Sequence, residues 1–394
     1  MLSQEALPLI QATLPVVKEY GEQITRHFYQ RMFLHHPELK NLFNMGNQSS
    51  GEQAQALAGS IYGYAANLDQ PEVLNPIMNR IAHKHVSLGI APNQYTIVGR
   101  HLMAAIAEVL GEAATPAILE AWDEAYWLMA TDLVAREARI YQDVTWEAGQ
   151  DWLTAEVVNK EAVAADVISL SLRPQDGRRI PFMPGQYLSV ALEVPALGLT
   201  QRRQYSLTGL PEEDELRISV KREQPGQGPA GRVSALLHDA VKPGDTLRIG
   251  PPAGDFVLGV GSAPLVLISA GIGITPVLSM LRQQAAASSP RQLVFAHANR
   301  AARHIAHLDE VTTALQRLPN ARFALWLEEP DQSVDARSGR MALEAIPALP
   351  LDGDFYLCGP LPFMHEQRQW LLAHGVPADA IHYEAFGPDV FGHG

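Results

Sequence analysis

Residues 80–90, RIAHKHVSLGI, close a segment whose apolar residues recur at helical spacing. In a helix over residues 72–88, the apolar residues that share one face are Leu74, Met78 and Ile81. His85 falls on the same stripe, because a helix completes a turn about every 3.6 residues. His83 is turned about 200° from His85 and faces the other way. The spacing therefore predicts that His85 points into the interior and His83 into water.

The rest of the first 150 residues has the same helical character. Apolar residues recur at helical spacing, and prolines mark the joints between segments. The expected helices cover roughly residues 4–20, 22–35, 52–68, 72–88, 93–111 and 116–142. This third of the chain is predicted to be all-α.

Three further residues are candidates for a pocket in front of His85. Tyr29 lies beside an apolar row, so its hydroxyl could enter such a pocket. Gln53 heads a helical row that continues with Leu57, and Phe43 sits on a short connection. Ordinary structural roles remain open for each: a hydrogen-bonded core histidine, an exposed helix end for Gln53, and core aromatics for Tyr29 and Phe43.

The pattern changes near residue 150. Strand-like segments separated by Pro, Gly and Asp turns follow, which predicts a small antiparallel β-barrel up to about residue 258. These segments are TAEVVNK, DVISLSL, QYLSVAL, RQYSLTG and ELRISVK. From residue 262, buried strands alternate with helices, including one from Thr275, which predicts an α/β doubly wound parallel sheet. The expected domains cover residues 1–147, 152–259 and 262–394.

Composition limits the possible partners and the cellular setting. The chain has 394 residues, 47% of them hydrophobic and 19% charged, which suits two or three domains with buried cores. A net charge of −13 argues against nucleic acid or an anionic membrane surface as a partner. The single cysteine, Cys358, excludes an intrachain disulfide and suits a reducing compartment. Without a signal-peptide pattern or a membrane-length apolar run, we expect a cytoplasmic monomer with no stable membrane insertion.

A motif on a predicted barrel strand, RRQYSL, suits a flavin. Arg203 would neutralise a pyrophosphate, Tyr205 would stack, and Ser206 would hydrogen-bond the ring. Tyr187 in PGQYLSV and the helix start at Gly231, where backbone N–H groups can hold phosphate, strengthen this interpretation. A strand with one arginine and one tyrosine is otherwise common, so the motif depends on that context.

A glycine-rich loop in LISAGIGITPVLSML predicts a nucleotide site. Gly271 and Gly273 would let the backbone approach a diphosphate, Thr275 can cap the following helix, and Pro276 suits its first turn. The motif is not a full G-x-G-x-x-G, so it does not establish a Rossmann site alone. Cys358, after a later strand, could be a nucleophile, but no histidine is placed to activate it. We interpret it as a small residue beside a nicotinamide.

The helical third closely resembles the globin domain of flavohemoglobins, through HFYQRMF, HHPELKNLFNMGNQ, IAHKHVSLGI and QYTIVGRHLM. Carried over by position, the implied heme-site residues are Tyr29, Phe43, Gln53, Leu57, Lys84, His85, Tyr95 and Glu137. The resemblance makes His85 the proximal ligand of the iron.

The same resemblance assigns the neighbours of that histidine. Phe43 would pack on the heme, while Tyr29, Gln53 and Leu57 would line the side that binds O₂. Tyr95 and Glu137 would orient the proximal histidine, although their sequence positions alone suggest surface or cap residues. A histidine that donates to a carboxylate is a stronger electron donor to iron, which favours peroxide-like O₂ chemistry over reversible binding.

Residues 152–394 resemble the ferredoxin–NADP⁺ reductase superfamily through these motifs and the C-terminal HYEAFGP. The implied FAD residues are Tyr187, Arg203, Gln204, Tyr205, Ser206, Glu384, Ala385, Phe386, Gly387 and Pro388, with Phe386 covering the flavin. The implied NAD(P) residues are Gly271, Ile272, Gly273, Ile274, Thr275, Pro276, Cys358 and Gly359. Two positions depart from the family: Ile274, where flavohemoglobins often have Gln, and Ala385, where Cys is common. Both departures could alter nicotinamide affinity.

The two resemblances together imply a nitric oxide dioxygenase that carries one heme b and one FAD. NADH or NADPH would reduce FAD by hydride transfer, FAD would pass single electrons to the heme, and O₂ on ferrous heme would convert nitric oxide to nitrate. Alternatives on the same heme are a lipid hydroperoxide reductase and an anaerobic nitric-oxide reductase. A gas sensor would have no reason to carry both reductase motifs. The choice of NADH or NADPH stays open, because Arg300 and Arg303 suit either a 2′-phosphate site or plain surface.

Overall fold

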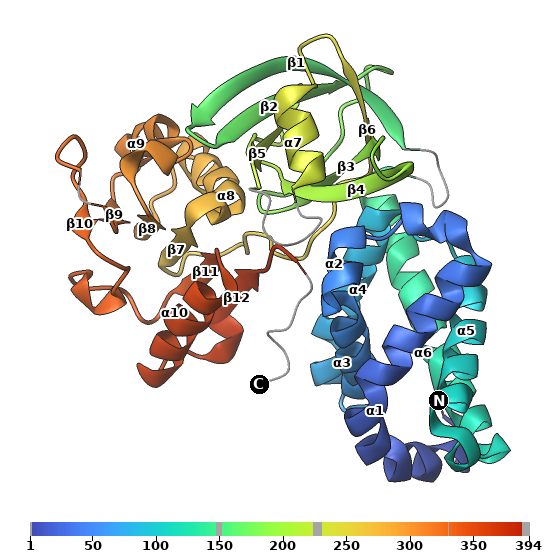
Figure 1. Cartoon of the computed structure of the whole chain (residues 1–394). Coiled ribbons are helices and arrows are strands. Elements are labelled where there is room, and N and C mark those ends of the chain that lie inside the picture. The colour runs from blue at the N-terminus through green and yellow to red at the C-terminus, as the bar shows by residue number, and fades with distance from the viewer. Residues whose placement is uncertain (1, 147–151, 224–230, 330, 388–394) are drawn as a thin grey trace.

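The computed structural model describes residues 2–146, 152–223, 231–329 and 331–387. The described chain forms a helical bundle, then a curved antiparallel sheet, then a parallel sheet flanked by helices (Figure 1). This is the predicted fold class. No described helix is long and apolar enough to cross a membrane. The domain limits expected from the sequence stay predictions.

The helical bundle is built from α1 (Ala6–His35), η1 (Pro37–Asn41), α2 (Met45–Ser50), α3 (Glu52–Ala66), α4 (Pro71–Leu88), α5 (Gln94–Leu110), η2 (Gly111–Ala113) and α6 (Pro116–Asp143). Local chemistry explains the ends of the long helices. Thr115 caps α6, since its hydroxyl accepts from the Ile118 N–H, and a proline follows at the first helical position. Gly89 ends α4 with a left-handed φ of 65°.

The predicted break between helices 4–20 and 22–35 is wrong, because α1 runs unbroken through both. Gly21 does not end a helix, but lets α1 pack closely against α3. A Cβ at this position would lie 3.3 Å from the Cβ of Ala58 on α3. Helix α2, with six residues, was not predicted, since it is too short to show a helical period.

The antiparallel sheet contains β1 (Leu153–Ala164), β2 (Val167–Pro174), β3 (Tyr187–Val194), β4 (Leu199–Ser206), β5 (Leu216–Lys221) and β6 (Thr246–Ile249), with α7 (Arg232–Asp239) before β6. Their order is β4-β3-β6-β1-β2-β5, and every pairing is antiparallel. A bridge between Leu207 and Ile218 brings the two edge strands together, as the predicted barrel requires. Strand β6 was not predicted from the sequence.

The C-terminal part contains β7 (Leu265–Ala270), η3 (Gly271–Gly273), α8 (Ile274–Ala286), β8 (Leu293–Asn299), η4 (Ala302–His304), α9 (Leu308–Gln316), β9 (Ala321–Leu327), β10 (Arg337–Ser338), η5 (Leu343–Ala345), β11 (Asp354–Cys358), α10 (Leu361–Ala373), η6 (Ala378–Ala380) and β12 (Ile381–Glu384). The order β10-β9-β8-β7-β11-β12 is parallel throughout. Because β7 and β11 are neighbours, the loops at their carboxyl ends meet at one edge of the sheet.

Candidate functional site

The imidazole of His85 is held by two buried groups from other helices. Its Nδ1 lies 2.8 Å from the Tyr95 hydroxyl on α5 and 2.9 Å from Oε1 of Glu137 on α6. Tyr95 also donates to that carboxylate oxygen. Burial and the Glu137 carboxylate raise the pKa of Tyr95 well above its usual value, so the phenol stays a donor. With Nδ1–H donating to Glu137, Nε2 of His85 keeps a lone pair for a metal.

The predicted exposure of His83 is wrong. Its ring is half-buried, and its Nδ1 accepts a hydrogen bond of 3.1 Å from the backbone N–H of Gly254 in the reductase part. Burial lowers the pKa of His83, and the nearby Asp255 carboxylate opposes this effect. Helical spacing separates the two faces of α4, but it says nothing about a second domain that covers the outer one.

Tyr29, Gln53 and Phe43 come together in the helical core. The ring of Tyr29 lies 5.7 Å from that of Phe43, and the Gln53 side chain lies at its hydroxyl together with Gln48 of α2. Burial raises the pKa of Tyr29, although these two amides oppose it, so its hydroxyl keeps its proton. Leu57 packs against the same core.

Unpaired polar atoms in this core fit a bound polar ligand. Oε1 of Gln53 and Nε2 of Gln48 are buried without a hydrogen-bond partner, and buried polar atoms normally have one. A small ligand beside the Tyr29 hydroxyl would accept from Nε2 of Gln48, whereas Oε1 of Gln53 requires a ligand or water that donates. Gln48 was missed by sequence reasoning, because it lies on the short α2, which no periodicity reveals.

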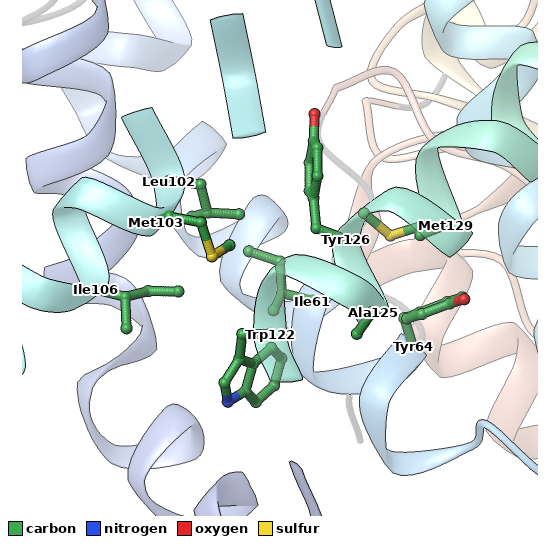
Figure 2. A pocket seen from close by; sticks show the side chains of 9 residues that line it. All are labelled: Ile61, Tyr64, Leu102, Met103, Ile106, Trp122, Ala125, Tyr126 and Met129. Carbon is green, nitrogen blue, oxygen red and sulfur yellow. The ribbon is translucent and has the colours of Figure 1, made fainter. Parts of the chain in front are cut away.

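An apolar cavity lies between α3, α5 and α6 (Figure 2). Its lining residues are Ile61, Tyr64, Leu102, Met103, Ile106, Trp122, Ala125, Tyr126 and Met129. Ile61 continues the row of Gln53 and Leu57 along α3, so the cavity extends from the same helix face. Tyr126 does not hold its hydroxyl free for a ligand, since it donates to the Tyr95 carbonyl at 2.5 Å.

Lys84 joins α4 to the strand that carries the flavin motif. Its Nζ donates to Oε1 of Gln204 at 3.1 Å. Burial lowers the pKa of Lys84, the Glu384 carboxylate raises it, and Arg203 adds to the lowering. Gln204 also donates to the Ser87 hydroxyl at 3.4 Å, so its side chain faces α4.

The other implied FAD residues lie on β3, β4 and the C-terminal segment. Tyr187 of β3 pairs with Ser206 of β4, and burial raises the pKa of Tyr187 and of Tyr205. The Ser206 hydroxyl is buried without a partner, which fits a hydrogen bond to a bound ring. Glu384 ends β12, a strand that the sequence did not predict. Ala385, Phe386 and Gly387 follow it, with Phe386 51% exposed, while Pro388 lies outside the described residues.

The implied nucleotide loops meet at the sheet edge. A Cβ at Gly273 would lie 2.2 Å from the Cys358 carbonyl oxygen, so only glycine lets the loops after β7 and β11 approach so closely. Ile272 and Ile274 flank Gly273, and Gly359 follows Cys358. Burial and the Glu384 carboxylate raise the pKa of the Cys358 thiol, so it is a neutral packing group.

Thr275 does not cap α8 as the motif predicted. The helix begins one residue earlier, at Ile274, and Pro276 lies in its first turn. The Thr275 hydroxyl donates instead to the Ile272 carbonyl at 2.9 Å. The short η3 turn, which leads from the strand into α8, shifts the helix start.

Three families match the three parts of the chain. Residues 26–133 match the globin family, 154–258 an oxidoreductase FAD-binding domain, and 267–369 an oxidoreductase NAD-binding domain. The chain is 44% identical to a flavohemoprotein of Rhizobium meliloti, over 99% of this chain and all of that protein. It belongs to the flavohemoproteins. The chain is therefore an NAD(P)H-dependent oxidoreductase that uses heme and FAD.

Solved structures agree with this family. The flavohemoglobin of Malassezia yamatoensis, with bound FAD and heme, superimposes with a TM-score of 0.89 and 35% identity, covering 98% of this chain and 100% of that one. The FAD/NAD-binding domain of a nitric oxide dioxygenase from Vibrio cholerae matches 61% of this chain and all of its own length, with a TM-score of 0.57 and 36% identity. The globin part and the reductase part of this flavohemoprotein thus have counterparts of known structure.

Proposed function

We propose that this flavohemoprotein is a nitric oxide dioxygenase, which uses NADH or NADPH and O₂ to convert nitric oxide to nitrate. The observation that carries the proposal is the buried Glu137 and Tyr95 pair on Nδ1 of His85. Such a carboxylate–histidine pair makes the ring a strong electron donor, which suits O₂ activation better than reversible O₂ storage. The relatedness of its reductase part to that of the Vibrio cholerae enzyme supports the same activity.

The residues of this chain would hold and orient the participants. When bound, heme supplies O₂ binding and FAD converts the two electrons of a hydride into single electrons. His85 would hold the iron through Nε2, while Glu137 keeps the Nδ1 proton in place. Tyr29 would donate its hydroxyl proton to a polar ligand, and Gln53 orients that hydroxyl. Phe43 and Leu57 exclude water from the same core.

The reductase residues would bring electrons to this pocket. Gly271 and Gly273 would admit the dinucleotide at the edge of the parallel sheet, and Ser206 and Tyr205 would hold the flavin ring. Lys84 bridges α4 and β4, and so would link the flavin strand to the helix that carries His85. We further propose that the chain works as a cytoplasmic monomer.

The test is NADH-driven nitric oxide consumption by the heme- and FAD-loaded chain, with and without O₂. The proposal expects fast consumption in air with nitrate as product, and little consumption once O₂ is removed. Equal rates with and without O₂ would instead assign the anaerobic nitric-oxide reductase activity.

A second candidate activity on the same heme is the reduction of lipid hydroperoxides. The cavity of Figure 2 has apolar walls, and it extends the α3 face that carries Gln53 and Leu57. Its volume of about 20 Å³ holds little more than a water molecule, so an acyl chain would enter only if the lining side chains moved apart. NADH oxidation by an alkyl hydroperoxide without O₂ or nitric oxide tests this activity. It would be the main one if that rate exceeded the rate with nitric oxide and O₂.

A further inference from the structure

A half-buried arginine of the reductase barrel reaches the end of the helix that carries His85. The guanidinium Nη1 of Arg202, on β4, donates to the carbonyl of Leu88, the last residue of α4. A helix ends with carbonyl groups that lack partners within the helix and carry partial negative charge. A cation is therefore the preferred donor at this position, and the bond is charge-assisted.

Trp152 completes this contact. The Arg202 guanidinium carbon lies 4.5 Å from the centre of the Trp152 ring. A Cβ at Gly89 would lie 2.9 Å from Nε1 of Trp152, and a Cβ at Gly250 would lie 3.2 Å from its ring. Two glycines thus make room for the indole, between the end of α4 and the end of β6. The first residue described after the helical bundle is packed against both domains.

Placing the charge of Arg202 here costs free energy of folding, which argues against a role in stability alone. Burial lowers the pKa of Arg202 to about 10, the neighbouring Arg248 adds to the lowering, and Tyr141 opposes it. Its Nε is buried without a hydrogen-bond partner among the described residues. A buried charge without an ion pair normally destabilises a fold. The contacts that Arg202 does make are with the Leu88 carbonyl at the end of α4 and with the Trp152 ring.

Strand β4 connects this contact to the flavin motif. Side chains alternate along a strand, and both Arg202 and Gln204 face α4, as their bonds to Leu88 and Lys84 demonstrate. Arg203, Gln204, Tyr205 and Ser206 of the same strand are among the residues implied to hold FAD. In Figure 1, β4 lies across the end of the helical bundle that α4 reaches. The strand that touches the heme-bearing helix therefore also carries residues implied to hold the flavin.

We propose that Arg202 is a positioning residue that fixes the distance between the flavin and the heme by locking the end of α4 to β4. This inference rests on His85 and β4 holding the two cofactors as proposed above. His85 lies less than one turn before Leu88, so movement of the helix end moves the imidazole directly. Lys84 and His83 would keep the preceding turn of α4 docked if Arg202 were removed. Loss of Arg202 would then loosen the geometry without separating the domains.

The test compares Arg202→Leu, Arg202→Lys and Arg248→Leu in the full chain loaded with heme and FAD. Stopped-flow absorbance without O₂ or nitric oxide follows flavin reduction by NADH and heme reduction as separate phases. We expect Arg202→Leu to slow the heme phase by about tenfold and to leave the flavin phase unchanged, because small misplacements of reacting groups cost rates of this order. Arg202→Lys, which can still donate to Leu88, should restore part of the rate. Arg248→Leu removes an exposed neighbouring charge and should match wild type.

A second readout does not depend on turnover. Amide hydrogen exchange should speed up at the end of α4 in Arg202→Leu, and not in Arg248→Leu. Wild-type heme reduction in Arg202→Leu, or an equal fall of the flavin and heme phases, would overturn the proposal. Since heme reduction is measured without nitric oxide, a failure of the nitrate assay would leave this result standing.

Discussion

The carboxylate of Glu137 on α6 lies 2.9 Å from Nδ1 of His85 on α4, although 52 residues separate them in the chain. The carboxylate is 3% exposed, so little water weakens this pair. The Tyr95 hydroxyl donates to the same oxygen and fixes its orientation. The buried Tyr95 and Glu137 therefore set which nitrogen of His85 carries the proton.

We expect Glu137→Gln to lower the rate of nitric oxide consumption about 10- to 100-fold, the usual effect of losing a partner of a metal-bound histidine. The amide is neutral, so the ring becomes a weaker donor to iron while the fold is kept. Nitric oxide consumption and heme content are measured together. Glu120→Gln, on the exposed side of α6, is the control. Wild-type rates in Glu137→Gln would contradict the role given to this carboxylate.

Tyr29→Phe should leave the chain folded and loaded with heme, because it removes only one hydroxyl from a packed ring. The deletion costs about 1 kcal/mol of unfolding free energy, as for a typical hydrogen bond. The distal pocket would lose its donor, so bound O₂ should dissociate faster. O₂ dissociation rates measure this effect, with Tyr20→Phe, an exposed tyrosine on α1, as the matched control. Equal dissociation rates in the two variants would exclude the Tyr29 hydroxyl as the ligand donor.

Gly273→Ala should abolish NADH oxidation while heme stays bound. The new Cβ would lie 2.2 Å from the Cys358 carbonyl, which forces the two nucleotide loops apart. Reduction of an artificial electron acceptor by NADH isolates this step from the heme. Gly261→Ala is the control, since its Cβ would meet nothing within 4 Å. Unchanged NADH oxidation in Gly273→Ala would place the dinucleotide elsewhere.

His297 gives a pH dependence of known sign. Burial lowers its pKa to about 3, and its Nδ1 lies 2.9 Å from the Ser269 hydroxyl. Unfolding returns the pKa to about 6.5, so the stability from neutral His297 is complete above that pH and is lost as pH falls toward 3. Between about pH 6 and pH 5, the unfolding free energy of wild type should fall more steeply than that of His297→Leu, by up to about 1.4 kcal/mol per pH unit. Urea titrations at each pH measure it, and parallel curves would contradict the assignment.

Much of this fold follows from patterns that are local in the sequence. Helical spacing, strand alternation and the change near residue 150 predict the three-part architecture, because each pattern reflects one element and its own buried face. Short elements escape such patterns, as α2 and β12 did. The predicted break between residues 4–20 and 22–35 falls at Gly21, which in the structure continues α1 and permits contact with Ala58.

The functional site likewise contains residues that local patterns predict and residues that they do not. The stripe on α4 singles out His85, but the partner of His83 is Gly254, 171 residues away on another domain. Tyr95 and Glu137 carry no local signal, and only family resemblance proposed them. Arg202 begins the RRQYSL motif, but nothing in the sequence indicates that it contacts α4. Contacts between domains depend on packing that no single segment encodes.

The central claim, that His85 holds the heme at which nitric oxide becomes nitrate, has one direct test. Nitrate formed from nitric oxide is measured in air with NADH for wild type, His85→Ala and His83→Ala. We predict a nitrate for every nitric oxide consumed by wild type. His85→Ala should lose both heme and nitrate formation but keep NADH-driven reduction of an artificial acceptor, while His83→Ala should retain heme. Nitrate formation that survives in His85→Ala, or that is lost with the heme in His83→Ala instead, would contradict the account.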